Sequence, residues 1–132
     1  MTPQELRLNE ARRWLILARK DLNASRLLIA EEPAASVFHS QQAAEKTAKA
    51  FLAFHDVPFR RTHDLRELGN QCEAIDPTLS PLLEDAAGLT DYAILFRYLD
   101  APREPDSPEA GDALSKAMHL CEAVAGLIPG AS

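Results

Sequence analysis

The sequence predicts an all-α fold, a bundle of five helices that forms one domain over residues 1–132. Two patterns carry this prediction. Apolar residues recur every three or four positions in five successive stretches, which is the period of a helix packed on one side. No stretch alternates apolar and polar residues with the Val, Ile and Thr content of a strand. The length of 132 residues suits a single core, because chains of roughly 100–150 residues usually form one domain.

Composition excludes several classes of protein. With 46% hydrophobic and 26% charged residues, the chain is neither disordered nor built around disulfides. No apolar run is long enough to span a membrane, and the polar N-terminus is unlike a secretory signal, so we expect a cytoplasmic protein. Cys72 and Cys121 fall within helical stretches, where we expect buried thiols.

The net charge of −6 is unevenly distributed. Residues 1–70 hold 11 Lys and Arg against 9 Asp and Glu, whereas residues 71–132 hold 3 against 11. An acidic chain is poorly suited to coating nucleic acid, because that affinity comes from neutralising phosphates. The first half can still accept a small anionic ligand.

The first two helices are long. Thr2, Pro3 and Glu5 form a capping-box pattern that begins a helix reaching about Glu32. Its expected buried stripe is Ala11, Leu15, Ala18, Leu22, Ser25 and Ile29. Pro33 ends this helix, because the residue before a proline is pushed out of the helical region. The second helix is expected from Pro33 to His55.

Three further helices are expected after a break at residues 56–59. Their expected bounds are His63 to Ile75, Ser80 to Arg97, and Ser107 to Leu127. Thr62 or Asp64 caps the first of them. Pro129 and Gly130 stop the last one.

Motifs that hold metals or phosphates are missing from the sequence. Its five glycines are scattered, and none forms a phosphate-binding loop. There is no paired-cysteine motif and no His-Glu-x-x-His helix. His119 and Cys121 lie two apart on a helix and point to different sides, so they cannot bind one ion together. We therefore expect neither a metal site nor a cofactor.

Three polar groups remain as candidate ligand-binding residues. They are Gln42, Glu45, Lys46 and Lys49 at helical spacing, then His63 and Asp64, and finally Arg97, Tyr98 and Asp100. Each group also has a structural explanation. Glu45 and Lys49 can pair on a solvated helix face. Asp64 suits a helix start and Arg97 a helix end, because each charge opposes the helix dipole there.

Four segments in order resemble the HEPN domain family. They are Ala18–Leu22 (ARKDL), Phe38–Leu52 (FHSQQAAEKTAKAFL), Thr62–Leu65 (THDL), and Tyr92 with Arg97–Asp100 (RYLD). The resemblance covers about residues 5–128, and Leu99 stands where the family usually has proline. It implies a four- to five-helix up-and-down bundle in prokaryotes, commonly a homodimer. Such domains are often encoded beside or fused to a minimal nucleotidyltransferase in toxin–antitoxin modules.

The resemblance also implies a test for ribonuclease activity. Many family members are metal-independent endoribonucleases that carry Arg, four to six residues and then His, paired across the dimer. No arginine stands at that spacing before His39, His55, His63 or His119, and no histidine follows Arg97 at that spacing. We therefore predict no catalytic residue and no ribonuclease of this type.

Three functions stay open. In the first, a non-enzymatic homodimer pairs with a minimal nucleotidyltransferase and binds a nucleotide in a groove, where Lys46, Lys49 and Arg97 meet phosphate. In the second, the chain is a toxin ribonuclease with a variant site around Arg97, Tyr98 and His63, and RNA is a partner only here. In the third, it is a purely structural interaction domain.

Overall fold

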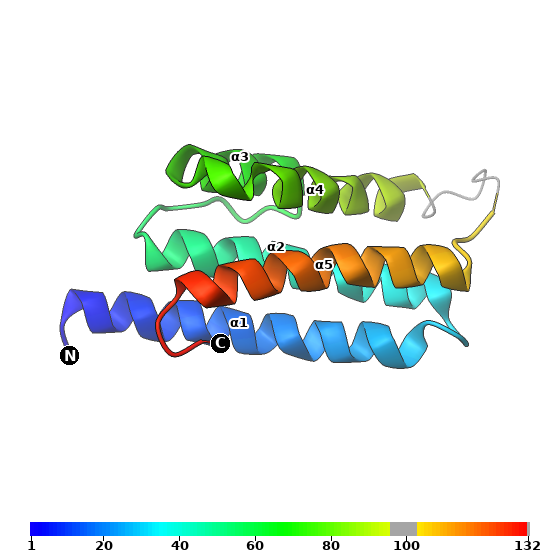
Figure 1. Ribbon diagram of the computed structural model, residues 1–132, viewed down its shortest axis with the longest axis horizontal. Helices are drawn as coiled ribbons and strands as arrows, with labels where there is room; N and C mark the ends of the chain where they lie inside the picture. The colour runs from blue at the N-terminus through cyan, green and yellow to red at the C-terminus, as the bar shows by residue number, and fades with distance from the viewer. Residues whose placement is uncertain (96–102, 132) are drawn as a thin grey trace.

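The computed structural model describes the backbone of residues 1–95 and 103–131, and the side chains of these residues except 91–95. Over these ranges the predicted all-α bundle is confirmed, with five α-helices, one 3₁₀ helix and no strand. The elements, shown in Figure 1, are α1 (Pro3–Leu28), α2 (Pro33–Phe54), α3 (Leu65–Ile75), η1 (Pro77–Leu79), α4 (Ser80–Leu95) and α5 (Ser107–Leu127).

Helix α2 is the centre of the bundle, because it contacts α1, α3, α4 and α5. Figure 1 shows the helices running along a common axis, with α3 and α4 stacked on one side of α2 and α1 on the other. After α2 ends, residues 55–64 turn back along it before α3 begins. This return places residue 63 beside the middle of α2 rather than beside its end.

Side-chain caps begin α1, α3 and α5. Thr2 and Glu5 form the predicted capping box of α1, and Asp64 caps α3 by accepting from the backbone N–H of Arg66 at 2.9 Å. Helix α5 begins at Ser107 as expected, but Asp106 is its capping residue, in a second capping box. The Ser107 hydroxyl instead donates to the carbonyl of Ile29 at 2.9 Å, which ties the start of α5 to the end of α1.

The expected helix ends hold to within a few residues. Helix α1 ends at Leu28, four residues before the expected Glu32, because the chain already turns ahead of Pro33. Helix α2 ends at Phe54, and the following turn holds Asp56 at a positive φ of 57°. The expected end of the fourth helix at Arg97 lies outside the described residues.

The predicted stripe of α1 faces the core. Ala11, Leu15 and Ala18 are fully buried, and Ser25 is buried in contact with α2. The Ser25 Oγ lies 2.9 Å from Ser36 Oγ and 2.7 Å from Ser40 Oγ. These small side chains let α1 and α2 approach closely while every buried hydroxyl keeps a partner.

Both thiols are buried, as predicted. Burial raises the pKa of Cys72 to about 12, and it also raises the pKa of Cys121. The Cys72 thiol donates to the carbonyl of Ala48 at 3.6 Å. His119 is exposed whereas Cys121 is buried, so the two point to different sides of α5 as expected. Over the described ranges, no helix is both long enough and apolar enough to cross a membrane.

Candidate functional site

The predicted residues Gln42, Glu45, Lys46 and Lys49 lie on one side of α2, which we call the polar face of α2. Three of them are half-buried, and Glu45 is buried. This side is therefore not the solvated surface on which Glu45 and Lys49 would form a simple pair. Each charged group is instead held by side chains from another part of the bundle.

Glu45 is bound by an amide and an imidazole. Its Oε1 accepts from the Gln41 amide at 3.0 Å, one helical turn earlier, and its Oε2 lies 3.0 Å from Nδ1 of His63. The Glu45 side chain is 2% exposed, whereas the His63 side chain is 80% exposed. A carboxylate acceptor at Nδ1 favours the tautomer that carries its proton there. The other ring nitrogen, Nε2, is then left to accept.

Lys46 belongs to a second cluster, which joins α2 to α1. Its ammonium lies 2.5 Å from Oδ2 of Asp21, and the other oxygen of Asp21 lies 2.8 Å from Nδ1 of His39. The Asp21 side chain is 12% exposed and that of Lys46 is 26% exposed. One carboxylate therefore holds two basic groups in position at the edge of the core.

Lys49 is held by aromatic rings. Its ammonium lies 5.4 Å from the ring centre of Trp14 on α1 and 6.0 Å from that of Phe59 in the segment before α3. The two rings pack edge to face with their centres 6.2 Å apart. A cation over a ring is attracted to its electron-rich face. The rings therefore hold Lys49 in position and leave its positive charge in place.

The remaining predicted residues divide into two groups. Asp64 is exposed and uses its carboxylate as the cap of α3, so it does not join the Glu45 cluster. Arg97, Tyr98 and Asp100 lie outside the described residues. The structure thus brings His63 to the polar face of α2 and leaves Asp64 at its margin.

Five contributing residues were not among the predicted site residues: Trp14, Asp21, His39, Gln41 and Phe59. Two of them carried a readable signal. Asp21 lies next to Leu22 on the buried stripe of α1, and Gln41 lies four positions before Glu45, where helix side chains meet. Trp14, His39 and Phe59 required the packing of separate segments, which no spacing within one helix indicates.

The described residues offer no cluster suited to a metal. No group of three or more His, Cys, Asp or Glu side chains among them could hold an ion. The arrangement instead holds two fixed lysine ammonium groups and one oriented imidazole on a rigid helix face. Such a surface is suited to binding an anion.

The sequence profile of the HEPN domain matches residues 11–127 of the 132-residue chain. The chain belongs to the HEPN domain family. The match includes the polar face of α2, both of its carboxylate clusters and the helix that follows residue 103. Comparisons with curated proteins and with solved structures found no match.

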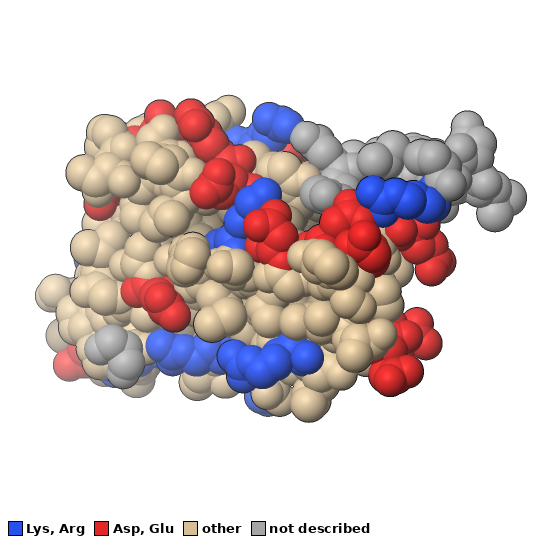
Figure 2. All heavy atoms as spheres, turned by 45° about the vertical axis from the view of Figure 1, so that its right-hand side comes forward, with Lys and Arg blue, Asp and Glu red and all other residues tan. Residues whose placement is uncertain are grey.

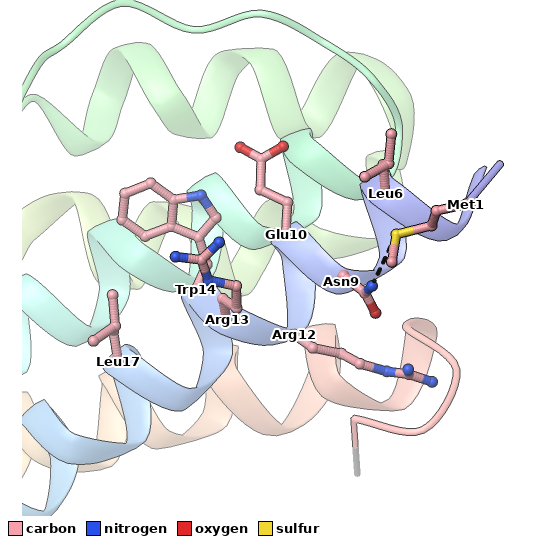
Figure 3. A pocket seen from close by; sticks show the side chains of 8 residues that line it. All are labelled: Met1, Leu6, Asn9, Glu10, Arg12, Arg13, Trp14 and Leu17. Carbon is pink, nitrogen blue, oxygen red and sulfur yellow. Dashed lines mark hydrogen bonds between the residues drawn. The ribbon is translucent and has the colours of Figure 1, made fainter. Parts of the chain in front are cut away.

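Outside the polar face of α2, this HEPN bundle exposes apolar side chains along its first helix. Seven large apolar side chains are exposed among the described residues, and four of them lie on α1: Leu6, Ile16, Leu17 and Leu27. A hollow of about 920 Å³ follows the first half of this helix. Figure 3 shows Leu6, Glu10 and Trp14 projecting from one side of α1, while Arg12 points away from that side.

Arginines follow another side of α1, beside α5. Figure 2 shows Lys and Arg side chains gathered in a row along the lower edge of the bundle, over α1. Arg12 donates to the carbonyl of Pro129 from Nε at 3.2 Å and from Nη2 at 3.0 Å, and Arg19 donates to the carbonyl of Ala131. Backbone carbonyls hold these guanidinium groups in place without cancelling their charge.

Proposed function

We propose that this HEPN chain is a non-enzymatic assembly subunit of a prokaryotic, cytoplasmic toxin–antitoxin-type module. It forms a homodimer, pairs with a minimal nucleotidyltransferase, and binds a nucleotide through the polar face of α2. The single observation that carries the assembly role is the exposure of Leu6, Ile16, Leu17 and Leu27 on one helix. A concentration of exposed apolar side chains on one element is typical of surfaces that meet another protein.

The polar face of α2 supports the nucleotide part of the proposal. Lys46 shares one carboxylate with His39, and Lys49 has rings rather than a carboxylate as its neighbours. Both ammonium groups are therefore positioned, and Lys49 has no carboxylate partner within the described residues, which suits the phosphates of a nucleotide. The missing Arg-x4–6-His motif supports a non-enzymatic role, because no histidine follows an arginine at the spacing that the ribonucleases of the family use.

Two measurements test this proposal. Co-expression with a minimal nucleotidyltransferase encoded beside the chain should give a complex that stays intact through size-exclusion chromatography. Independent elution of the two proteins would remove the pairing.

Calorimetric titration with ATP, GTP and their monophosphates should show binding that weakens in Lys46→Ala and Lys49→Ala. Lys20→Ala, on an exposed part of α1, is the matched control. Absence of binding, or equal binding by all variants, would remove the nucleotide site.

A second function is favoured by one observation, the oriented imidazole of His63. A buried carboxylate on Nδ1 and an exposed ring are the arrangement of a general base, so a ribonuclease with a variant site remains the alternative. It predicts that overexpression arrests growth and degrades RNA, and that His63→Ala and Glu45→Gln abolish both effects. Harmless overexpression with intact RNA would exclude it.

A further inference from the structure

One face of α1 carries a symmetric pattern of residues, with a leucine at each end and two opposite charges between them. Leu6, Glu10, Arg13 and Leu17 follow one another at intervals of four, three and four residues, and we call them the Leu6–Leu17 face. All four are exposed, and Leu6 and Leu17 keep 56% and 43% of their surface in solvent. They line the hollow along the first half of α1 shown in Figure 3. Intervals of four, three and four are those of a seam between two packed helices.

The symmetry has a centre between Ala11 and Arg12. Leu6 and Leu17 lie equally far from this point on either side, and so do Glu10 and Arg13. If a second copy of the helix runs antiparallel across the face, each leucine meets the other leucine. Each glutamate then meets an arginine. The same alignment sets Leu6 against Leu17 twice and Glu10 against Arg13 twice, as a two-fold axis requires.

We propose that the Leu6–Leu17 face is the homodimer interface, occupied by the same face of a second copy of this chain. The inference rests on the homodimer of the proposed function and names the surface that forms it. Its support is the self-complementary order of charge, since a surface that matches itself under two-fold rotation is what an isologous contact needs. Neither Glu10 nor Arg13 has an ion pair within the described part of the chain.

The rest of α1 explains why this face is free to take that partner. The buried stripe of Ala11, Leu15 and Ala18 faces the core, and Arg12 and Arg19 turn toward the C-terminal tail. The Leu6–Leu17 face lies on a different side from both. Two bundles can therefore meet along α1 without displacing any contact inside either one.

A charge-swap cycle tests the interface. Glu10→Arg and Arg13→Glu each set like charges against one another at two symmetric places, so each should weaken dimerisation about tenfold or more. The double variant Glu10→Arg/Arg13→Glu restores opposite charges and should recover the dimer. The measurement is size-exclusion chromatography with light scattering, over concentrations that extend to about 1 mM. Circular dichroism confirms that every variant keeps its helices.

Leucine substitutions give an independent arm. Leu17→Glu should abolish the dimer, whereas Leu27→Glu should leave it intact, because Leu27 is 73% exposed on the same helix but lies beyond the seam. A dimer that survives both single charge swaps and Leu17→Glu would overturn this interface and leave the homodimer standing. A wild-type chain that is monomeric at every concentration would remove the homodimer as well. Pairing with a nucleotidyltransferase is measured separately, so its failure is distinguishable from either result.

Discussion

The carboxylate of Glu45 and the imidazole of His63 join the middle of α2 to the segment that precedes α3, across 3.0 Å between Oε2 and Nδ1. The pair is asymmetric, because the glutamate is buried and the histidine faces solvent. The second oxygen of the carboxylate is held from within α2 by Gln41. The segment of residues 55–64 is thereby held to α2 by a carboxylate that is buried in the core.

This asymmetry predicts unequal effects on stability. Glu45→Ala should lower the free energy of unfolding by about 2–4 kcal/mol, because it leaves the Gln41 amide without its acceptor and opens a cavity. His63→Ala should cost less than about 1 kcal/mol, because most of its ring is in solvent. Urea unfolding of the two variants provides the comparison. Equal losses, or a larger loss for His63→Ala, would contradict the buried role of Glu45.

Asp21 is expected to matter more than an ordinary surface carboxylate. Asp21→Ala should destabilise the fold by about 2 kcal/mol, because Lys46 and His39 lose their shared acceptor at the α1–α2 contact. The double variant Asp21→Ala/Lys46→Met should recover part of that loss, since the uncompensated charge is gone. Both are measured by thermal unfolding at neutral pH. A double variant less stable than Asp21→Ala would show that Lys46 contributes by another route.

The raised pKa of Cys72 predicts a specific loss of stability in alkali. The unfolded thiol ionises near pH 9, whereas the folded thiol stays neutral until about pH 12. The preference for the folded state is complete below the unfolded pKa and is lost as the pH rises toward the folded one. The slope is about 1.4 kcal/mol per pH unit for one proton. Urea unfolding between these pH values should show a shallower decline for Cys72→Ala than for the wild type.

Gly130 is the position at which a methyl group is least tolerated in the C-terminal tail. Its φ is +72°, and an added Cβ would lie 2.4 Å from Nη2 of Arg12. Gly130→Ala should lower the stability by about 1 kcal/mol, through backbone strain and a displaced Arg12. Gly126→Ala is the control, because no atom beyond the adjoining backbone of α5 lies within 4 Å of the added carbon there. It should be neutral or stabilising in the same thermal unfolding experiment. Equal melting temperatures for both variants would show that the tail is not held as described.

The fold was readable from the sequence because its signals are local. Pro33 marks the boundary between two long helices, and the Thr2–Glu5 capping box begins the first of them where predicted. Asp106 was missed as a cap because Ser107 and Pro108 also form an acceptable helix start. Ser107 does not act as the cap because its hydroxyl donates to the distant carbonyl of Ile29.

The candidate site could be predicted only in part, because helical spacing is a local signal. Helical spacing placed Gln42, Glu45, Lys46 and Lys49 on one side of α2, and the structure confirms that grouping. Spacing could not show that Glu45 is buried, because its burial depends on the return of residues 55–64 along α2. The partners Trp14 and Phe59 likewise come from segments that meet only in the folded chain.

The hydrogen bonds from α1 to the segment after α5 have a consequence for how the protein folds during synthesis. Arg12 and Arg19 emerge early from the ribosome, yet their carbonyl partners belong to residues 129 and 131. Helix α1 therefore cannot complete its contacts until the segment that follows α5 has been made. Long-range closure of this kind slows folding and leaves partly made chains exposed to proteases and chaperones. Ribosome-bound chains stalled shortly before residue 129 should be digested at α1 far more readily than the released protein.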